Sequence, residues 1–322
     1  MLNITFTTFN FGTSGSFVNG PGTSIYNLCR ILKKYNKDIN IDVFSHLEPG
    51  TNDRRMFNVR PLDDRRSVIK SINNSDILHN WSGLGKLHKE YIYIANKNKK
   101  DVFIGPNAID CVSLLSEKAF LKNLSFKKIF TINTRLRHLI SKEHEIDLSR
   151  INLLMVGPDP AVWAPSEEKK FDVLWKGNAA HFVKDVEFGI SVSKRLPQYS
   201  FKFIGYPDPY RYKDHIEDAK SSKIYMCTSL SETMGIALME QWLAGVPSIT
   251  HPKIYLHGAN YETGIVTNRD LDSYCEAVVE IMSNNNLHAS MSQGCRLYME
   301  NNFSDKNTYN NYMNIIGELY VG

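Results

Sequence analysis

The chain has 322 residues, of which 42% are apolar, which is enough for two hydrophobic cores of ordinary domain size. No stretch approaches the roughly 20 apolar residues that a membrane-spanning helix needs, and Met1 to Phe11 lacks the features of a secretory signal peptide. The five cysteines are scattered without a CxxC spacing, which favours reduced thiols. These features exclude a membrane-spanning or disulfide-stapled protein and predict a cytoplasmic location.

The net charge of +4 is unevenly distributed along the chain. Residues 1–150 carry 23 Lys and Arg against 14 Asp and Glu, whereas the remainder carries 15 against 20. A basic half beside an acidic half indicates an anionic partner for the first half. Random drift of solvated surface charge explains the same asymmetry, and the sequence leaves both interpretations open.

The first half begins like a Rossmann-like unit. An apolar, Thr-rich run from Leu2 to Phe9 predicts a strand, and a polar loop then leads through Gly20-Pro21-Gly22 into an amphipathic pattern. The amino end of such a helix is suited to an anion such as phosphate. Gly20 and Gly22 are candidate donor-binding residues on this basis, and a plain turn before the helix is the alternative. A GxGxxG motif is not present here.

Three further runs in the first half predict strands, namely 39–45, 102–104 and 127–133. Another short apolar run ends at His79, which places this histidine at the carboxyl edge of the predicted sheet, where ligands collect in open α/β folds. His79 is therefore a candidate catalytic residue. A hydrogen-bonded packing role is the alternative.

The second half repeats the alternation of strands and helices. Strands are predicted at 171–175, 200–204 and 223–227, a helix at 183–196, and three helices at 270–282, 287–299 and 305–319. Tyr206 follows one of these strands in a turn and is a candidate for stacking on a nucleotide base. A packing role is again the alternative.

The most informative stretch runs from Cys227 to His251. Ser231 and Thr233 are good N-capping residues, Gly235 permits close approach of a ligand to the backbone, and the unpaired amides of the following helix suit an anion. Glu240 lies in an otherwise apolar helix, where an unpaired carboxylate is costly. A capped helix with two ordinary glutamates is the alternative to a ligand site.

The residues from Glu232 through Glu240 to Pro247 resemble the E-x7-E signature of retaining glycosyltransferases of family 4, which are GT-B enzymes. The resemblance implies that Glu232 contacts the donor sugar and that Glu240 binds the ribose hydroxyls. It also implies that the backbone amides around Thr233, Met234 and Gly235 face the sugar or the phosphates.

The resemblance extends to the segment after the strand at 171–175. Gly177 and Lys184 match the family, in which an Arg and a Lys clamp the donor diphosphate, but Asn178 stands where Arg is usual and Asp185 where Gly is usual. An amide does not replace the guanidinium fork. Either Lys176 substitutes for the missing cation or the grip on the phosphate is weaker. Lys184 joins Glu232 and His79 as a candidate catalytic residue, and Gly177 and Asn178 join the donor-binding candidates.

The predicted fold is α/β, of GT-B type, with two Rossmann-like domains facing across a cleft. Residues 1–165 form the acceptor-side domain, 166–304 the nucleotide-sugar-binding domain, and 305–322 a helix that crosses back to the first domain. The predicted activity is transfer of a hexose-type sugar from a nucleotide-sugar to a glycan or small-molecule acceptor, with retention of anomeric configuration. No cofactor and no metal are expected, because no HxxxH pair occurs and Asp270-x-Asp272 suits a helix start.

Two alternatives remain open. One is a phage or viral glycosyltransferase that acts on hydroxymethylated DNA bases in the host cytoplasm, which the basic first half and the Asn, Lys and Ile content favour. The other is a GT-B-like protein that binds a nucleotide-sugar without turnover. Asn178, and the occurrence of Asn107 in a region where relatives carry a histidine, favour this second alternative.

Overall fold

The computed structural model describes residues 1–12, 20–48, 56–106, 127–208, 215–232, 235–254 and 262–320. The chain divides into two compact units. Unit 1 comprises residues 1–156 together with 305–322, and unit 2 comprises residues 157–304. Each unit is an α/β layer structure built on its own parallel sheet.

Within the described residues, unit 1 holds a seven-stranded sheet in the order β3-β2-β1-β4-β5-β6-β7, and every neighbouring pair is parallel. The central strands β1 and β4 are largely buried on both faces, as parallel strands covered by helices require, although both include polar residues. The strands are β1 (Leu2–Thr8), β2 (Ile39–Ser45), β3 (Val59–Pro61), β4 (Ile77–Asn80), β5 (Asp101–Ile104), β6 (Lys128–Thr131) and β7 (Ile151–Leu153).

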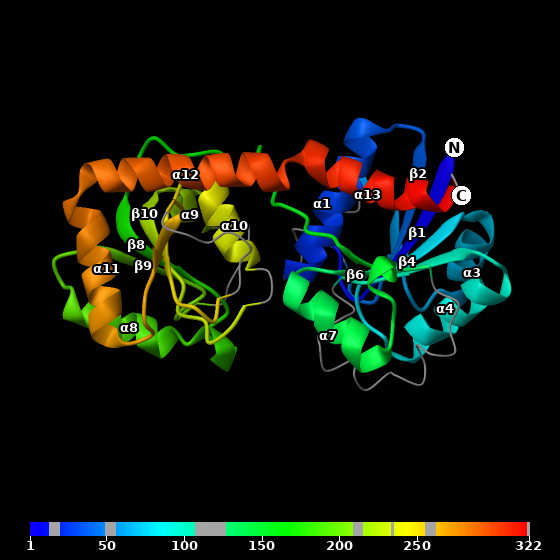
Figure 1. The fold of residues 1–322 in the computed structure, drawn as a ribbon, viewed down its shortest axis with the longest axis horizontal. Helices are drawn as coiled ribbons and strands as arrows, with labels where there is room; N and C mark the ends of the chain where they lie inside the picture. Colours follow the sequence, from blue (N-terminus) through cyan, green and yellow to red (C-terminus); the bar gives the residue numbers. More distant parts are fainter. Residues whose placement is uncertain are drawn as a thin grey trace. The chain divides into compact units, whose positions relative to one another are not determined.

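Helices pack against this sheet and close its core. They are α1 (Gly20–Tyr35), α3 (Arg65–Asn74), α4 (Lys86–Lys97), α7 (Thr134–His144) and α13 (Asp305–Tyr320), with a 3-10 turn at Leu148–Arg150. Figure 1 shows α13, in red, beside α1, in blue. Asp305 at the start of α13 accepts hydrogen bonds from Arg30 at 2.7 and 2.8 Å and from Lys34 at 2.8 Å. These charge-assisted bonds fix the last helix to the first unit.

Unit 2 is built on a smaller parallel sheet. The described strands follow the order β12-β11-β10-β8-β9. They are β8 (Phe171–Lys176), β9 (Phe201–Ile204), β10 (Ser222–Met226), β11 (Ser248–Thr250) and β12 (Gly264–Val266). The helices are α8 (Val186–Arg195), α9 (Ile216–Lys220), α10 (Ile236–Leu243), α11 (Leu271–Ser283) and α12 (Asn285–Phe303), with a 3-10 turn at Phe182–Lys184.

The strand orders define where ligands are expected. In unit 1 the chain order reverses direction between β1 and β4, and in unit 2 it reverses between β8 and β10. Open α/β sheets bind ligands at the carboxyl ends of the strands flanking such a reversal, because the connections leave on opposite faces and open a crevice there. A ligand site in unit 2 is therefore expected at the loops that follow β8 and β10. None of the helices in the described part of the chain has the length and apolar character needed to cross a bilayer.

Candidate active site

Two lysines and two glutamates meet at the reversal point of unit 2. Lys176 is the last residue of β8, and its ammonium donates to Oε2 of Glu240 on α10 at 2.5 Å. The two side chains are 4% and 1% exposed. The ammonium also lies 4.3 Å from the centre of the Trp163 ring. Burial lowers the pKa of Lys176, and the charge of Glu240 opposes that shift. The pair explains how a carboxylate is tolerated in an apolar helix.

The second pair joins Lys184 to Glu232. Nζ of Lys184 donates to Oε1 of Glu232, and both side chains are partly accessible, at 28% and 15%. Ser229 donates its hydroxyl to the same carboxylate oxygen at 2.7 Å. A Cβ on Gly177 would lie 3.3 Å from Cγ of Lys184 and 3.2 Å from the Trp175 ring. Gly177 therefore lets the aliphatic stem of Lys184 lie close over β8.

The amino end of α10 lies between Glu232 and Glu240 in the sequence. The helix begins at Ile236, and Gly235 caps it with φ of 60° and no side-chain cap bond. The expectation that Ser231 or Thr233 caps the helix fails for Ser231, because the left-handed turn at Gly235 directs the chain into the helix instead. A positive φ suits glycine, so this position requires glycine for its backbone conformation. Thr233 and Met234 lie outside the described residues.

Asp185 shows why a departure from the family pattern is tolerated. This residue has φ of 46°, a left-handed conformation that glycine adopts freely and that Asp tolerates better than most residues. Its side chain caps α8 by accepting from the amide of Phe188, and it forms an ion pair with Arg269. The predicted helix at 183–196 begins only at Val186, after a 3-10 turn that ends at Lys184.

The remaining donor-binding candidates fall into three situations. Asn178 is exposed, and its side chain accepts from the amide of Ala180 at 3.1 Å, so it braces its own loop. Tyr206 is exposed in the turn after β9, with its ring edge-on to Phe203. In unit 1, Gly20 opens α1, and a Cβ on Gly22 would lie 2.6 Å from the Asn10 amide nitrogen. Packing against Asn10 thus accounts for Gly22.

His79 takes the packing role. Its ring is fully buried among aromatic side chains, Nδ1 bonds to the Tyr312 hydroxyl at 2.8 Å, and Nε2 bonds to the Gly105 carbonyl at 2.7 Å. Burial lowers the pKa of His79 to about 3. A neutral ring with both nitrogens engaged has no atom left for proton transfer, so these contacts correct the expectation of a catalytic histidine at this position.

Sequence reasoning missed two residues of the site. His251 is buried, and its Nε2 donates to the carbonyl of Ser229 at 2.7 Å, which holds the residue that bonds to Glu232. Arg269 follows β12 and pairs with Asp185 beside the Lys184 turn. Neither residue belongs to a recognisable motif, because each acts through tertiary contacts. Over the described ranges, no group of three His, Cys, Asp or Glu side chains is placed to hold a metal ion.

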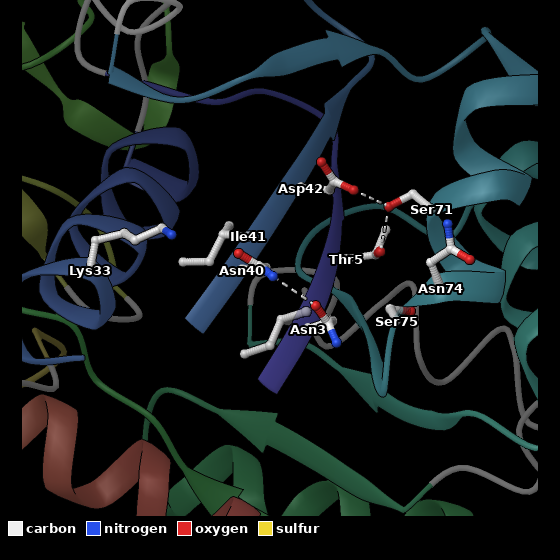
Figure 2. Close-up of a pocket in the computed structure, with 10 residues that line it drawn as sticks. Asn3, Thr5, Lys33, Asn40, Ile41, Asp42, Ser71, Asn74 and Ser75 are labelled. Atoms are coloured by element: carbon white, nitrogen blue, oxygen red, sulfur yellow. Dashed lines mark hydrogen bonds between the residues drawn. The ribbon is translucent and has the colours of Figure 1, made fainter. Parts of the chain in front are cut away.

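A separate polar cavity of about 320 Å³ lies in unit 1. Figure 2 shows Thr5 and Asp42 pointing toward Ser71, whose hydroxyl lies 2.7 Å from the Thr5 hydroxyl and donates to Asp42 at 2.6 Å. The cavity also includes Asn3 and Asn40, close to the amino ends of β1 and β2. It therefore opens at the edge of the sheet opposite to the one where ligands bind in this class of fold.

Comparison with known structures identifies the architecture. A glycosyltransferase from Rickettsia africae matches with a TM-score of 0.75 at 14% identity, covering 99% of this chain and 98% of that one. Sucrose-phosphate synthase from Thermosynechococcus elongatus matches with a TM-score of 0.72 at 10% identity over the full length of both chains. Anabaena HepE in complex with UDP matches with a TM-score of 0.71 at 9% identity, covering 99% of this chain and 100% of that one.

The fold is that of the GT-B glycosyltransferases. No family model matches the sequence, and no curated protein sequence is similar to it. At these identities the likeness establishes the GT-B fold alone, which confirms the fold class predicted from the sequence.

Proposed function

We propose that the protein is a glycosyltransferase that moves a sugar from a nucleotide-sugar to an acceptor with retention of anomeric configuration. The observation that carries the proposal is the Lys184–Glu232 pair, which is partly accessible at the reversal point of unit 2 and lies shortly before the start of α10 at Ile236. The GT-B fold and the HepE complexes with UDP and UDP-glucose support a donor of this class.

The chemistry required is stabilisation of negative charge on the departing diphosphate. Lys184 supplies a cation, and the first amides of α10 supply donors that have no partner within the helix. In the ligand-free protein the Lys184 ammonium is held by Glu232. Donor binding exchanges that partner for phosphate oxygens, which leaves Glu232 to hydrogen-bond to the sugar hydroxyls.

Glu240 has a different role from Glu232, because its charge is balanced by Lys176 in a buried ion pair. The Lys176 ammonium, which itself lies over the Trp163 ring, fixes the position of the Glu240 carboxylate before the donor arrives. We assign Glu240 to the ribose hydroxyls. Lys176 does not take over the phosphate contact of the missing arginine in this arrangement, because its ammonium is engaged by Glu240 and buried. Arg269, 25% exposed beside the Lys184 turn, is the better-placed second cation.

The test is a thermal-shift screen against UDP-, GDP-, ADP- and dTDP-sugars, followed by an assay for release of the nucleoside diphosphate. A true donor raises the melting temperature by mass action, and turnover releases the free diphosphate. Glu232→Gln should keep the shift and lose the release. If no donor of the four classes produces a shift in the wild-type protein, the proposal is wrong. A shift without any release in the presence of varied acceptors indicates a binding protein that has lost turnover.

A further inference from the structure

A second group of side chains gathers at the reversal point of unit 1, where β1 and β4 are neighbours. Asn80 ends β4, and His88 lies in the first turn of α4. The Asn80 side-chain oxygen accepts from the Thr7 hydroxyl at 2.8 Å and from Nδ1 of His88 at 2.7 Å, and its amide nitrogen donates to the Gly83 carbonyl at 2.8 Å. The bonds to Thr7 and Gly83 fix which atom of the Asn80 side chain is oxygen and which is nitrogen. Because the oxygen faces His88, Nδ1 of His88 carries the hydrogen and Nε2 presents a lone pair.

The Nε2 atom of His88 is left open by the local backbone. No hydrogen bond from the described residues reaches it, although the side chain is only 5% exposed. Gly83 has φ of 85°, and a Cβ at that position would lie 3.1 Å from Nε2. Any other residue there would cover the atom. Burial lowers the pKa of His88 to about 4, so at neutral pH the ring is uncharged and Nε2 is a hydrogen-bond acceptor.

An exposed aromatic pair stands at the same edge of the sheet. Phe9 follows β1 and His46 follows β2, and their rings are stacked with centroids 5.4 Å apart. The backbone pairing continues past the strands, since His46 donates to the Thr8 carbonyl at 3.1 Å. Phe9 is 43% exposed. The hydroxyl of Ser82 accepts from the Phe9 amide at 2.9 Å, which connects the stacked Phe9–His46 pair to the segment that follows Asn80.

We propose that this cluster, formed by Phe9, His46, Gly83 and His88, binds a sugar ring of the acceptor. A hydroxyl of the ring donates to Nε2 of His88, and the carbon face of the ring packs on Phe9. Sugars combine hydroxyl donors with an apolar face, which is what an aromatic surface beside a lone acceptor recognises. A fully ionised phosphate group fits poorly, because its oxygens carry no hydrogen to donate to Nε2. The proposal deepens the proposed function by placing its acceptor on unit 1.

The test is binding of the full-length protein to a glycan array, with and without UDP, followed by calorimetry with the best-bound glycan. His88→Asn keeps a hydrogen-bond donor for Asn80 and removes Nε2, and Phe9→Ser removes the aromatic ring on which the sugar packs. We expect each to weaken glycan binding at least tenfold. The matched controls are His138→Asn and Tyr93→Ser, which change an exposed histidine on α7 and an exposed tyrosine on α4. Both should bind as the wild type does.

Three results would overturn the proposal. These are a wild-type protein that binds no glycan, a His88→Asn variant with unchanged melting temperature and unchanged glycan affinity, and binding of duplex DNA that depends on His88 while no glycan competes. The donor thermal shift, measured on the same preparations, separates this proposal from the broader one. His88→Asn should keep the wild-type shift. Glycan binding that depends on His88 without any donor shift would defeat the transferase and leave a sugar-binding site.

Discussion

Lys176 and Glu240 form a buried ion pair with 2.5 Å between the ammonium nitrogen and the carboxylate oxygen. Lys184 and Glu232 form the second pair. The two lysines are eight residues apart, as are the two glutamates, and the first lysine pairs with the second glutamate. The two glutamates of the E-x7-E motif therefore pair with lysines at the end of β8 and in the turn that follows it. The Lys176–Glu240 pair is buried, whereas the Lys184–Glu232 pair is partly accessible to solvent.

The buried pair makes a prediction about stability. Lys176→Met should lower the free energy of unfolding by about 3–5 kcal/mol, because it leaves the charge of Glu240 buried without a partner. The double variant Lys176→Met with Glu240→Leu should recover much of that loss. Urea unfolding measures both. Arg195→Ala is the control, since its pair with Asp272 is exposed and should contribute less than about 1 kcal/mol. A loss of that smaller size for Lys176→Met would contradict the burial argument.

The accessible pair makes a prediction about activity. Glu232→Ala should lower kcat by about 100-fold or more, because under the proposed function it removes the group that contacts the reacting sugar. The free energy of unfolding should change by less than about 1 kcal/mol, as is usual for a partly exposed pair. Diphosphate release and urea unfolding on one preparation give the two numbers. Full activity of the variant with the true donor would show that the site is assigned to the wrong residue.

Most of the fold was predictable because the spacing of apolar residues along the sequence differs between strands and helices. Alternating apolar strands and amphipathic helices gave both Rossmann-like sheets, and the strand at 39–45 has the expected limits. The E-x7-E stretch indicated a candidate site because its residues are contiguous in the sequence, and the donor-binding roles assigned to them stay predictions. Helix starts were less accurate, because the left-handed residues Asp185 and Gly235 set them through backbone geometry rather than through capping side chains.

The contacts of the site were not predictable in the same way. Nothing in the sequence links Arg269 to Asp185, or Asn80 to His88, because these pairs depend on which strands become neighbours. His79 illustrates the opposite error. Its position at a strand end was inferred correctly, but the aromatic side chains that enclose it come from β1, β5, β6 and α13, and a local pattern does not show that enclosure.

Gly235 makes a prediction about donor binding. Its φ of 60° is strained for a β-branched residue, so Gly235→Val should shift the start of α10 and raise the Kd for the nucleotide-sugar at least tenfold. Gly235→Asn is the matched variant, because asparagine tolerates this conformation. It should bind the donor within a few-fold of the wild type. Equal losses in the two variants would indicate that the absence of a side chain, and not the backbone conformation, is what the donor requires.

His79 makes a prediction about acid stability. Its pKa is about 3 in the folded protein and about 6.5 in the unfolded chain, so the unfolded chain binds more protons between these values. The stability contribution is full above pH 6.5 and is lost as the pH falls. Between pH 7 and 4.5, His79 should account for a loss of about 2–3 kcal/mol in the free energy of unfolding. His79→Gln should be less stable at pH 7 yet lose less stability over that interval. Urea unfolding at several pH values tests this. An unchanged slope for His79→Gln would mean that the buried ring titrates in the folded protein as it does in water.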